Sequence, residues 1–200
     1  MSYVLRIPWL LYLALLGVSS AALSVEASTT ANAPAEALRV AVSSYRVPAV
    51  SLVRQTGETV SLEEEINDGR PVVLNFIFTS CGAICPLMTQ TLASFQHLLG
   101  PEATRVHIMS ISIDPEEDTP ARLRDYAREF HAQPGWTFYT GTSEASIAAQ
   151  KAFNMYRGDK MSHSAVTLMR VAPGASWKRV DGFASPEQLL QEYRGLLASR

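Results

Sequence analysis

The residues of this chain with the clearest capacity for chemistry are its two cysteines, Cys81 and Cys85. They lie in Phe78-Thr79-Ser80-Cys81-Gly82-Ala83-Ile84-Cys85-Pro86, between an apolar run and a helix-like segment. At a helix N-terminus the unpaired backbone N–H groups and the helix dipole favour thiolate over thiol. If the loop turns helically, residues four apart share a face, so both thiols can point at one object. The pair could therefore bind a soft metal, close a disulfide bond, or do both.

Two neighbouring segments are expected to position these thiols. Residues 71–78 form a continuous apolar run bounded by turn signals, which is typical of a strand covered on both faces. Pro86 opens a helix that is predicted to end near Leu99, because its apolar residues recur at helical spacing. Gln96 and His97 fall on the side of this helix that is expected to face solvent.

The segment upstream of this unit predicts a hairpin and a short helix. Residues 49–54 and 58–62 flank a turn that contains Gly57, which is typical of a β-hairpin. Ser61 and Glu64 have the spacing of a capping box, which predicts a short helix directly after the hairpin.

The rest of the chain alternates between strand and helix patterns. Strands are expected at 106–113, 136–139, 164–171 and 177–180, and helices at 120–130, 143–153 and 186–197, with Thr119, Ser143 and Ser185 as caps. Strands joined by crossover helices should be parallel, with one antiparallel hairpin near the end. The sequence thus predicts an α/β, thioredoxin-like fold: a central mixed sheet flanked by helices, with an N-terminal hairpin extension.

The first 25 residues differ from everything after them. Arg6 is the only charged residue before Glu26, residues 7–18 are almost wholly apolar, and small residues follow as far as Ala22. This order is typical of a secretory signal peptide. The alternative is an uncleaved membrane tether through residues 7–23. Both interpretations predict export, either to the periplasm or to the outer face of the cytoplasmic membrane.

These patterns divide the chain into three parts. Residues 1–22 are predicted to be a signal peptide or N-terminal membrane anchor. Residues 23–43, rich in Ala, Ser and Thr, are predicted to be a flexible linker, in which residues 37–42 could form a short helix. Residues 44–200 are predicted to be the globular domain.

Composition excludes one class of partner. The chain has 200 residues, a formal net charge of −2 and no cluster of lysine and arginine, so nucleic acid is not an expected partner. An apolar content of 47% with 18% charged residues is typical of a globular protein.

The cysteine count and spacing exclude several common sites. A disulfide between residues four apart closes a very small loop and stabilises little, so reversible chemistry explains the pair better than a structural bridge. Structural zinc and iron–sulfur sites usually take four ligands, and haem attachment needs a histidine where Pro86 stands. Copper(I) is soft and accepts few ligands, so two thiolates and one further donor would suit it.

Four histidines could supply the further donor. His97, His107 and His131 are expected to be surface or packing residues, whereas His163 directly precedes the strand that opens the late hairpin. In a thioredoxin-like topology this loop faces the dithiol, at the position where thiol oxidoreductases carry a cis-proline. His163 is therefore a candidate third donor.

Other candidates lie near the same loops. Met88 and Met161 carry sulfur, although both are expected mainly to fill the core. Asp114 and Asp118 follow the second predicted strand, where an acidic loop can lie beside a site. Asp118 also fits a plainer role in the turn and cap that begin the next helix.

Four blocks of sequence, in this order, resemble the Sco/SenC family. They are V-L-N-F-I-F-T-S-C-G-A-I-C-P (73–86), S-I-D-P-E-E-D-T-P (112–120), W-T-F-Y-T-G (136–141) and S-H-S-A-V-T (162–167). The similarity extends over about residues 45–197. The family comprises exported or membrane-tethered proteins of thioredoxin fold that bind copper through two cysteines and a histidine. They assist assembly of the dinuclear copper (CuA) centre of cytochrome c oxidase.

The resemblance implies a ligand set and a partner. By motif position the copper ligands fall on Cys81, Cys85 and His163, for Cu(I), Cu(II) or both. The implied partner is the copper-accepting subunit of cytochrome c oxidase or another copper chaperone. The chain departs from the family at Ser162, where an aspartate is frequent, and at Gly82, where a proline is frequent.

Two enzymatic interpretations stand beside the metallochaperone. The same dithiol could make the chain a thiol–disulfide oxidoreductase that reduces cysteines of a respiratory or exported partner. A peroxidase would need an activated cysteine with a threonine and an arginine around it, and only Thr79 is placed near the cysteines. We therefore interpret the chain as a copper-binding assembly factor, with reductase activity as the alternative.

Overall fold

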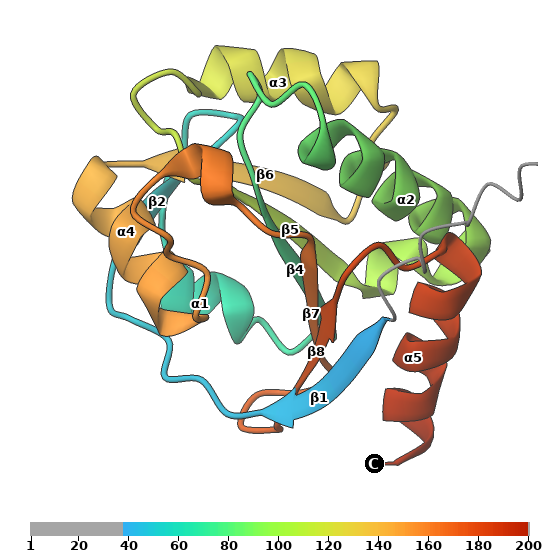
Figure 1. Ribbon diagram of the computed structural model, residues 1–200. Coiled ribbons are helices and arrows are strands. Elements are labelled where there is room, and N and C mark those ends of the chain that lie inside the picture. Colours follow the sequence, from blue (N-terminus) through green and yellow to red (C-terminus); the bar gives the residue numbers. More distant parts are fainter. Residues whose placement is uncertain (1–37, 200) are drawn as a thin grey trace, which may run out of the picture. The chain divides into compact units, whose positions relative to one another are not determined.

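The computed structural model describes residues 38–199 and contains one mixed β-sheet (Figure 1). Its strands are β1 (Arg39–Ser43), β2 (Ser51–Arg54), β3 (Thr59–Ser61), β4 (Val72–Ile77), β5 (His107–Ser112), β6 (Trp136–Gly141), β7 (Val166–Arg170) and β8 (Trp177–Asp181). Their order across the sheet is β1-β8-β7-β4-β5-β6-β2-β3. The predicted hairpin β2–β3 thus extends one edge of the sheet.

Strand directions agree with the prediction. The pairs β4–β5 and β5–β6 are parallel, as required for strands joined by crossover helices, whereas β7 and β8 form an antiparallel hairpin. β7 also pairs antiparallel with β4, and β2 pairs antiparallel with β6. The carboxyl ends of the parallel strands β4 and β5 therefore meet at one edge, where the cysteine loop begins.

Helices cover both faces of the sheet (Figure 1). They are α1 (Leu62–Ile66), α2 (Ile84–Leu99), α3 (Pro120–Glu129), α4 (Ser143–Ala152) and α5 (Pro186–Ala198), with short 3₁₀ turns η1 (Gly100–Arg105) and η2 (Lys160–Ser162). Side chains of α2, α3 and α5 share one apolar core, and those of α1 and α4 share the other. No helix among residues 38–199 is long and apolar enough to cross a membrane.

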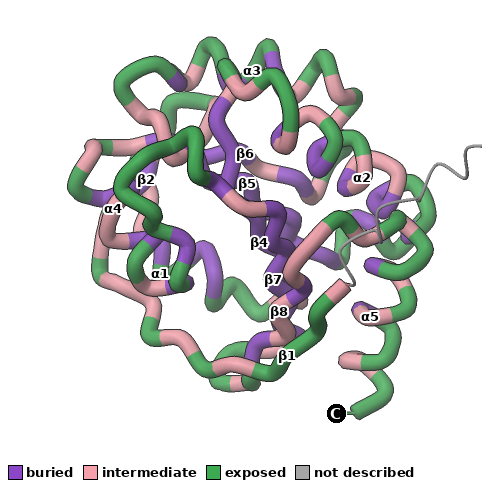
Figure 2. The backbone as a smooth tube through the Cα atoms, in the orientation of Figure 1, coloured by how far each residue is buried: buried purple, intermediate pink, exposed green. Residues whose placement is uncertain are grey.

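The central strands are buried along their whole length (Figure 2). In β4, Val73 and Ile77 pack in the core under α2, whereas Leu74 and Phe76 pack in the core under α1 and α4. Successive side chains point to opposite faces of a strand, so a strand covered on both sides is apolar at nearly every position. This explains the continuous apolar run in the sequence. The exception in β4, the buried Asn75, accepts the hydroxyl of Ser110.

Most predicted helix starts are confirmed. Ser61, Thr119 and Ser185 each accept a backbone N–H bond with the side-chain oxygen, at α1, α3 and α5. The prediction for α4 is wrong by one residue: Thr142 is the cap, because its hydroxyl accepts the N–H of Ala145, and Ser143 is the first helical residue.

The start of the domain differs from the prediction. Residues 37–42 were expected to form a short helix at the end of a flexible linker over 23–43. This is wrong for residues 39–43, which form β1 and pair antiparallel with β8. An alternating Val-Ala-Val sequence suits a strand once a neighbouring strand supplies its hydrogen bonds. The signal peptide or anchor predicted for residues 1–22 lies outside the described residues.

Candidate metal centre

The two cysteines lie at the junction of β4 and α2: Cys81 in the loop between them and Cys85 in α2. The helix begins at Ile84, two residues before the predicted start at Pro86, so Cys85 is already in its first turn. Ala83 caps the helix without any side-chain hydrogen bond, which leaves first-turn N–H groups available. One of them, the N–H of Cys85, donates to Sγ of Cys81 at 3.4 Å. The predicted pairing of both thiols at a helix start is confirmed.

The two thiols have opposite ionisation tendencies. Burial favours the neutral Cys81 thiol, but backbone N–H groups of Cys85, Ala83 and Ile84 outweigh burial and hold the Cys81 pKa below its ordinary value. Burial raises the pKa of Cys85 to about 12, and the neighbouring charges of Cys81 and Asp118 act in the same direction. Both are free thiols, with Cys81 half-buried and Cys85 fully buried. Cys81 is thus the more reactive sulfur.

His163 is buried at the end of η2, with 6% of its surface exposed. Its Nε2 lies 2.9 Å from the carbonyl oxygen of Phe76, the penultimate residue of β4. A carbonyl only accepts, so Nε2 carries the proton and donates. The lone pair of the neutral ring is therefore on Nδ1, which makes no hydrogen bond to any residue among 38–199. His163 thus has one nitrogen available to a metal.

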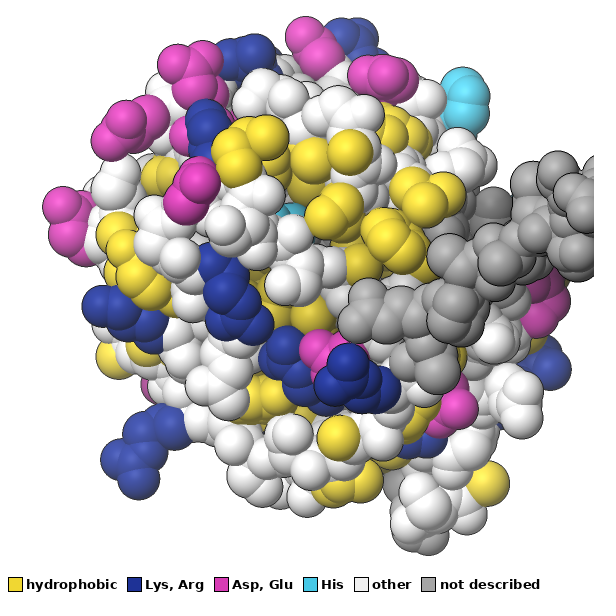
Figure 3. Space-filling view, viewed as in Figure 1, with side chains coloured by type: hydrophobic (Ala, Val, Ile, Leu, Met, Phe, Trp, Pro, Cys, Tyr) yellow, Lys and Arg dark blue, Asp and Glu magenta, His cyan; other side chains and the backbone are white. Residues whose placement is uncertain are grey.

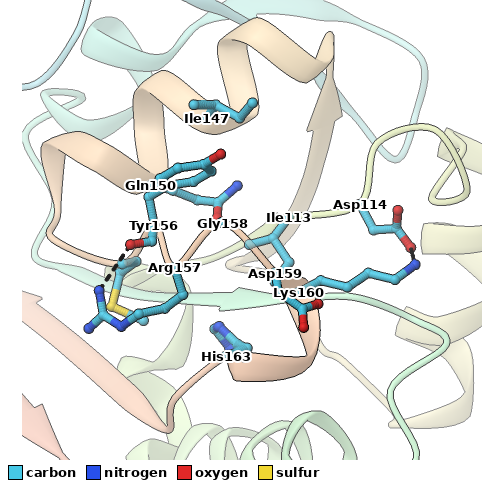
Figure 4. A pocket seen from close by; sticks show the side chains of 11 residues that line it. Ile113, Asp114, Ile147, Gln150, Tyr156, Arg157, Gly158, Asp159, Lys160 and His163 are labelled. Atoms are coloured by element: carbon cyan, nitrogen blue, oxygen red, sulfur yellow. Dashed lines mark hydrogen bonds and ion pairs between the residues drawn. The ribbon is translucent and has the colours of Figure 1, made fainter.

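The surroundings of His163 keep it neutral. Burial lowers its pKa, against the opposing effect of the Phe76 carbonyl, and the positive charge of Arg157 lowers it further. His163 borders a cavity of about 420 Å³, with Ile147 and Gln150 on the opposite side (Figure 4). A neutral imidazole is the form that binds metals.

The three predicted ligands are not assembled into one group. Within the described part of the chain, no set of three or more His, Cys, Asp and Glu side chains is arranged to hold a metal ion. The cysteines lie together, but His163 is not grouped with them. The donor types fit copper, whereas the arrangement would require a movement of His163 or of the cysteine loop. The ligand set stays a prediction.

The other candidate donors behave largely as expected. His97 and His131 are exposed, and His107 is buried within a packing network. Met88 is buried in the core, but Met161 is 73% exposed rather than core-filling.

Two acidic residues have contacts that sequence reasoning did not identify. Asp118 was expected either to lie beside the site or to serve the turn and cap before the next helix. Its backbone N–H closes that turn by bonding to Asp114, while its carboxylate is fully buried and bonds to Thr79, just before Cys81. Asp114 forms an ion pair with Lys160, of 2.6 Å, which crosses to the loop of His163 (Figure 4). The only sequence signal for either was an acidic loop at the carboxyl end of a strand.

The face around the dithiol is partly apolar. Apolar side chains gather on the face shown in Figure 3, over the region that the start of α2 occupies in Figure 1. Leu87, in the first turn of α2, is half exposed. A face of this kind suits contact with another protein.

Comparisons with known proteins define the class of this chain. Residues 43–198 match the SCO1/SenC family, so the chain belongs to that family. The SCO1 protein homolog of Bacillus subtilis (strain 168) is 38% identical over 104 residues, which are 52% of this chain and 53% of that protein. The match therefore spans about half the length of this relative.

Two solved structures support the predicted fold. BsSco, a member of the Sco family of cytochrome c oxidase assembly proteins with a disulfide switch, matches with a TM-score of 0.65 and 29% identity, over 78% of this chain and 95% of that chain. Arabidopsis thaliana ScoI, solved with copper bound, matches with a TM-score of 0.64 and 24% identity, over 75% of this chain and 96% of that chain. The thioredoxin-like fold is confirmed.

Proposed function

We propose that this protein binds copper through Cys81, Cys85 and His163 and delivers it during assembly of the CuA centre of cytochrome c oxidase. The observation that carries the proposal is the donor set: an activated thiol, a second thiol four residues later in the first turn of α2, and a buried imidazole with a free Nδ1. Membership of the SCO1/SenC family and the copper-bound ScoI structure support the choice of metal.

Copper is the cargo of this site rather than a resident cofactor. Two thiolate sulfurs are soft ligands that suit Cu(I), and the neutral nitrogen of His163 suits Cu(II). Cys81 is the sulfur that presents a thiolate first, because Cys85 is buried and its pKa is raised to about 12. Copper binding would remove the Cys85 proton, so the affinity for copper falls in acid. Ligand exchange at the half-buried Cys81 would then pass the ion to a partner.

Copper titration of the reduced, purified full-length chain tests this proposal. The expected result is one copper ion per chain, with a Cu(II)–thiolate absorption band that is lost in Cys81→Ser and in Cys85→Ser and altered in His163→Ala. Met161→Leu is the matched control, because it removes an exposed sulfur near His163 without touching the proposed ligands. A stoichiometry far below one, or an unchanged spectrum in His163→Ala, would overturn the ligand set.

A second function rests on the unequal reactivity of the two thiols. An accessible Cys81 with a lowered pKa and a buried Cys85 are the attributes of an attacking and a resolving cysteine. The disulfide switch of BsSco supports reversible oxidation of such a pair. If the double variant Cys81→Ser/Cys85→Ser loses function in cells and His163→Ala keeps it, thiol–disulfide exchange is the main activity.

The proposed setting is outside the cytoplasm, in the periplasm or at the outer face of the cytoplasmic membrane. The sequence of residues 1–25, with one charge and a long apolar stretch, supports export. The proposed partner is the copper-accepting subunit of the oxidase or another copper chaperone. Fractionation of cells that express the full-length chain measures the location, and the mass of the recovered chain measures whether residues 1–22 are removed.

A further inference from the structure

Asp118 has an unusual position for a carboxylate, because it is fully buried and its hydrogen bonds within residues 38–199 include no cationic partner. Its Oδ1 accepts the hydroxyl of Thr79 at 2.5 Å, and its Oδ2 accepts the hydroxyl of Ser112 at 2.6 Å. The backbone N–H of Thr79 lies 3.2 Å from both oxygens. Two hydroxyls and one amide therefore replace the water that a buried carboxylate would otherwise need.

These contacts join segments that are distant in the sequence. Thr79 follows β4 and leads into Cys81, Ser112 ends β5, and Asp118 lies in the turn before α3. Capping of α3 does not explain the carboxylate, because the hydroxyl of Thr119 accepts the helix N–H. The side chain of Asp118 instead holds the first residues of the cysteine loop against the end of β5.

The same cluster continues toward the loop of His163. Oγ of Ser112 accepts the backbone N–H of Asp114 at 3.0 Å, and the Asp114 carboxylate pairs with Lys160 at 2.6 Å. The backbone carbonyl of Lys160 accepts the N–H of His163 at 3.2 Å. A continuous series of polar contacts thus runs from Thr79 to His163, and Asp118 is its buried centre.

We propose that Asp118 is a positioning residue for the candidate metal centre, which sets the cysteine loop relative to the loop of His163. This inference rests on the proposed function, since it concerns how the proposed ligands are placed. Asp118 touches neither the copper nor a reacting sulfur in this role. It acts through Thr79 on the cysteine loop, and through Ser112 and Asp114 on the other loop.

Asp118→Asn in the full-length chain is the most direct test. Asparagine keeps the size of the side chain and one acceptor oxygen, but it turns the second acceptor into a donor. We expect the affinity for Cu(II) to fall about 10- to 100-fold, as is usual when a residue behind the ligands is replaced. We also expect the Cu(II)–thiolate band to shift, and alkylation of metal-free Cys81 at neutral pH to slow because its N–H donors are less well aligned.

Gln96→Ala is the matched control. Gln96 is also buried and holds a loop by three hydrogen bonds, to Gln133 and Pro134, at the opposite end of α2. If the role of Asp118 is only structural, both variants lower the urea midpoint and neither changes the band position or the Cys81 alkylation rate of the folded protein. That result, or equal changes in both variants, overturns the proposal.

Thr79→Val keeps the test decisive if Asp118→Asn does not fold. This variant preserves shape and removes only the hydroxyl that bonds to Asp118, so the proposal predicts smaller changes in the same directions. Wild-type values in a folded Thr79→Val chain would then overturn it. Alkylation of the metal-free protein separates the two proposals: if the wild type binds no copper, the proposed function fails, while a slower Cys81 reaction in Asp118→Asn still supports positioning.

Discussion

The two buried histidines, His107 and His163, differ in the groups that surround their ring nitrogens. His107, 2% exposed, has Nε2 2.8 Å from the hydroxyl of Tyr139, and the carboxylate of Asp68 lies 2.9 Å from its Nδ1 without forming a hydrogen bond. His163, 6% exposed, forms one hydrogen bond through its ring nitrogens to the described residues, from Nε2 to the Phe76 carbonyl. Burial lowers the pKa of both rings. Burial and pKa therefore do not distinguish a packing histidine from a candidate ligand. The surroundings of the rings do, because a carboxylate lies against Nδ1 of His107, whereas His163 borders a cavity.

The residues around His107 and those around the cysteines also differ in how their polar groups are paired. Around His107, the carboxylate of Glu65 accepts the hydroxyl of Tyr139 and the guanidinium of Arg54, so opposite charges face one another. Around the cysteines, Cys81 is half-buried, and the buried carboxylate of Asp118 is held by neutral donors. The first region is closed by its own contacts and serves stability. The second leaves donor atoms free, which a site that accepts and releases an ion requires.

Glu65→Ala is expected to produce the largest loss of stability. It leaves the buried hydroxyl of Tyr139 and the guanidinium of Arg54 without their acceptor, which should lower the free energy of unfolding by roughly 2–4 kcal/mol. This range is below that for a fully buried pair, because Arg54 is a third exposed and also pairs with Glu58. Urea denaturation measures the loss, with Glu65→Gln as the isosteric control. Copper binding by the folded fraction should be unchanged, and reduced binding would contradict the separation of the two regions.

Replacing each of the two buried histidines in turn is expected to give the next largest effects, on Cu(II) affinity for His163 and on stability for His107. His163→Ala should weaken Cu(II) binding by at least about 10- to 100-fold, the range for residues that only support a ligand. His107→Ala should leave Cu(II) affinity unchanged and lower the free energy of unfolding by about 1–3 kcal/mol, because Tyr139 and Asp68 lose a partner. Competition with a copper chelator measures the affinities. The reverse pattern would mean that His107, and not His163, binds the metal.

Much of the fold could be predicted because its patterns are local. The apolar run of β4 and the caps Ser61, Thr119 and Ser185 depend on nearby residues alone, and the structure confirms them. Contacts between distant segments could not be predicted in this way. Gln96 was expected to face solvent, but it is buried because it binds the loop at Gln133.

The candidate site shows the same division. The spacing of Cys81 and Cys85 placed both at a helix start, which is a local property. The carboxylate of Asp118 meets Thr79 across 39 positions, and no pattern near either residue indicates the contact. His163 follows the expected loop, but its orientation depends on a carbonyl of β4, 87 positions away.

The depressed pKa values of both histidines predict a pH dependence of stability. Each ring binds a proton more weakly in the folded chain than in the unfolded one, so the unfolded state gains protons first as the pH falls. The free energy of unfolding should therefore be highest above the ordinary histidine pKa of about 6.5 and decrease below it, by at most about 1.4 kcal/mol per pH unit for each histidine. Urea denaturation between pH 7.5 and pH 5.5 (about one unit on either side of 6.5) measures this slope. His107→Gln should reduce the slope and keep the part due to His163; an unchanged slope would contradict the assignment.

Lys160→Met is expected to have the smallest effect, and it separates the regions by their response to salt. Lys160 pairs with Asp114 while 41% of its side chain is exposed, so mobile ions screen the pair. Its loss should leave the urea midpoint within error of the wild type and weaken Cu(II) binding slightly at low ionic strength, because the loop of His163 loses one anchor. At high ionic strength wild type and variant should bind Cu(II) equally, since salt has already weakened the pair. The stability loss of Glu65→Ala should persist at high salt, because that carboxylate is buried against its partners. A salt-independent effect of Lys160→Met would mean that the lysine contributes through packing over the ring of Phe78 rather than through charge.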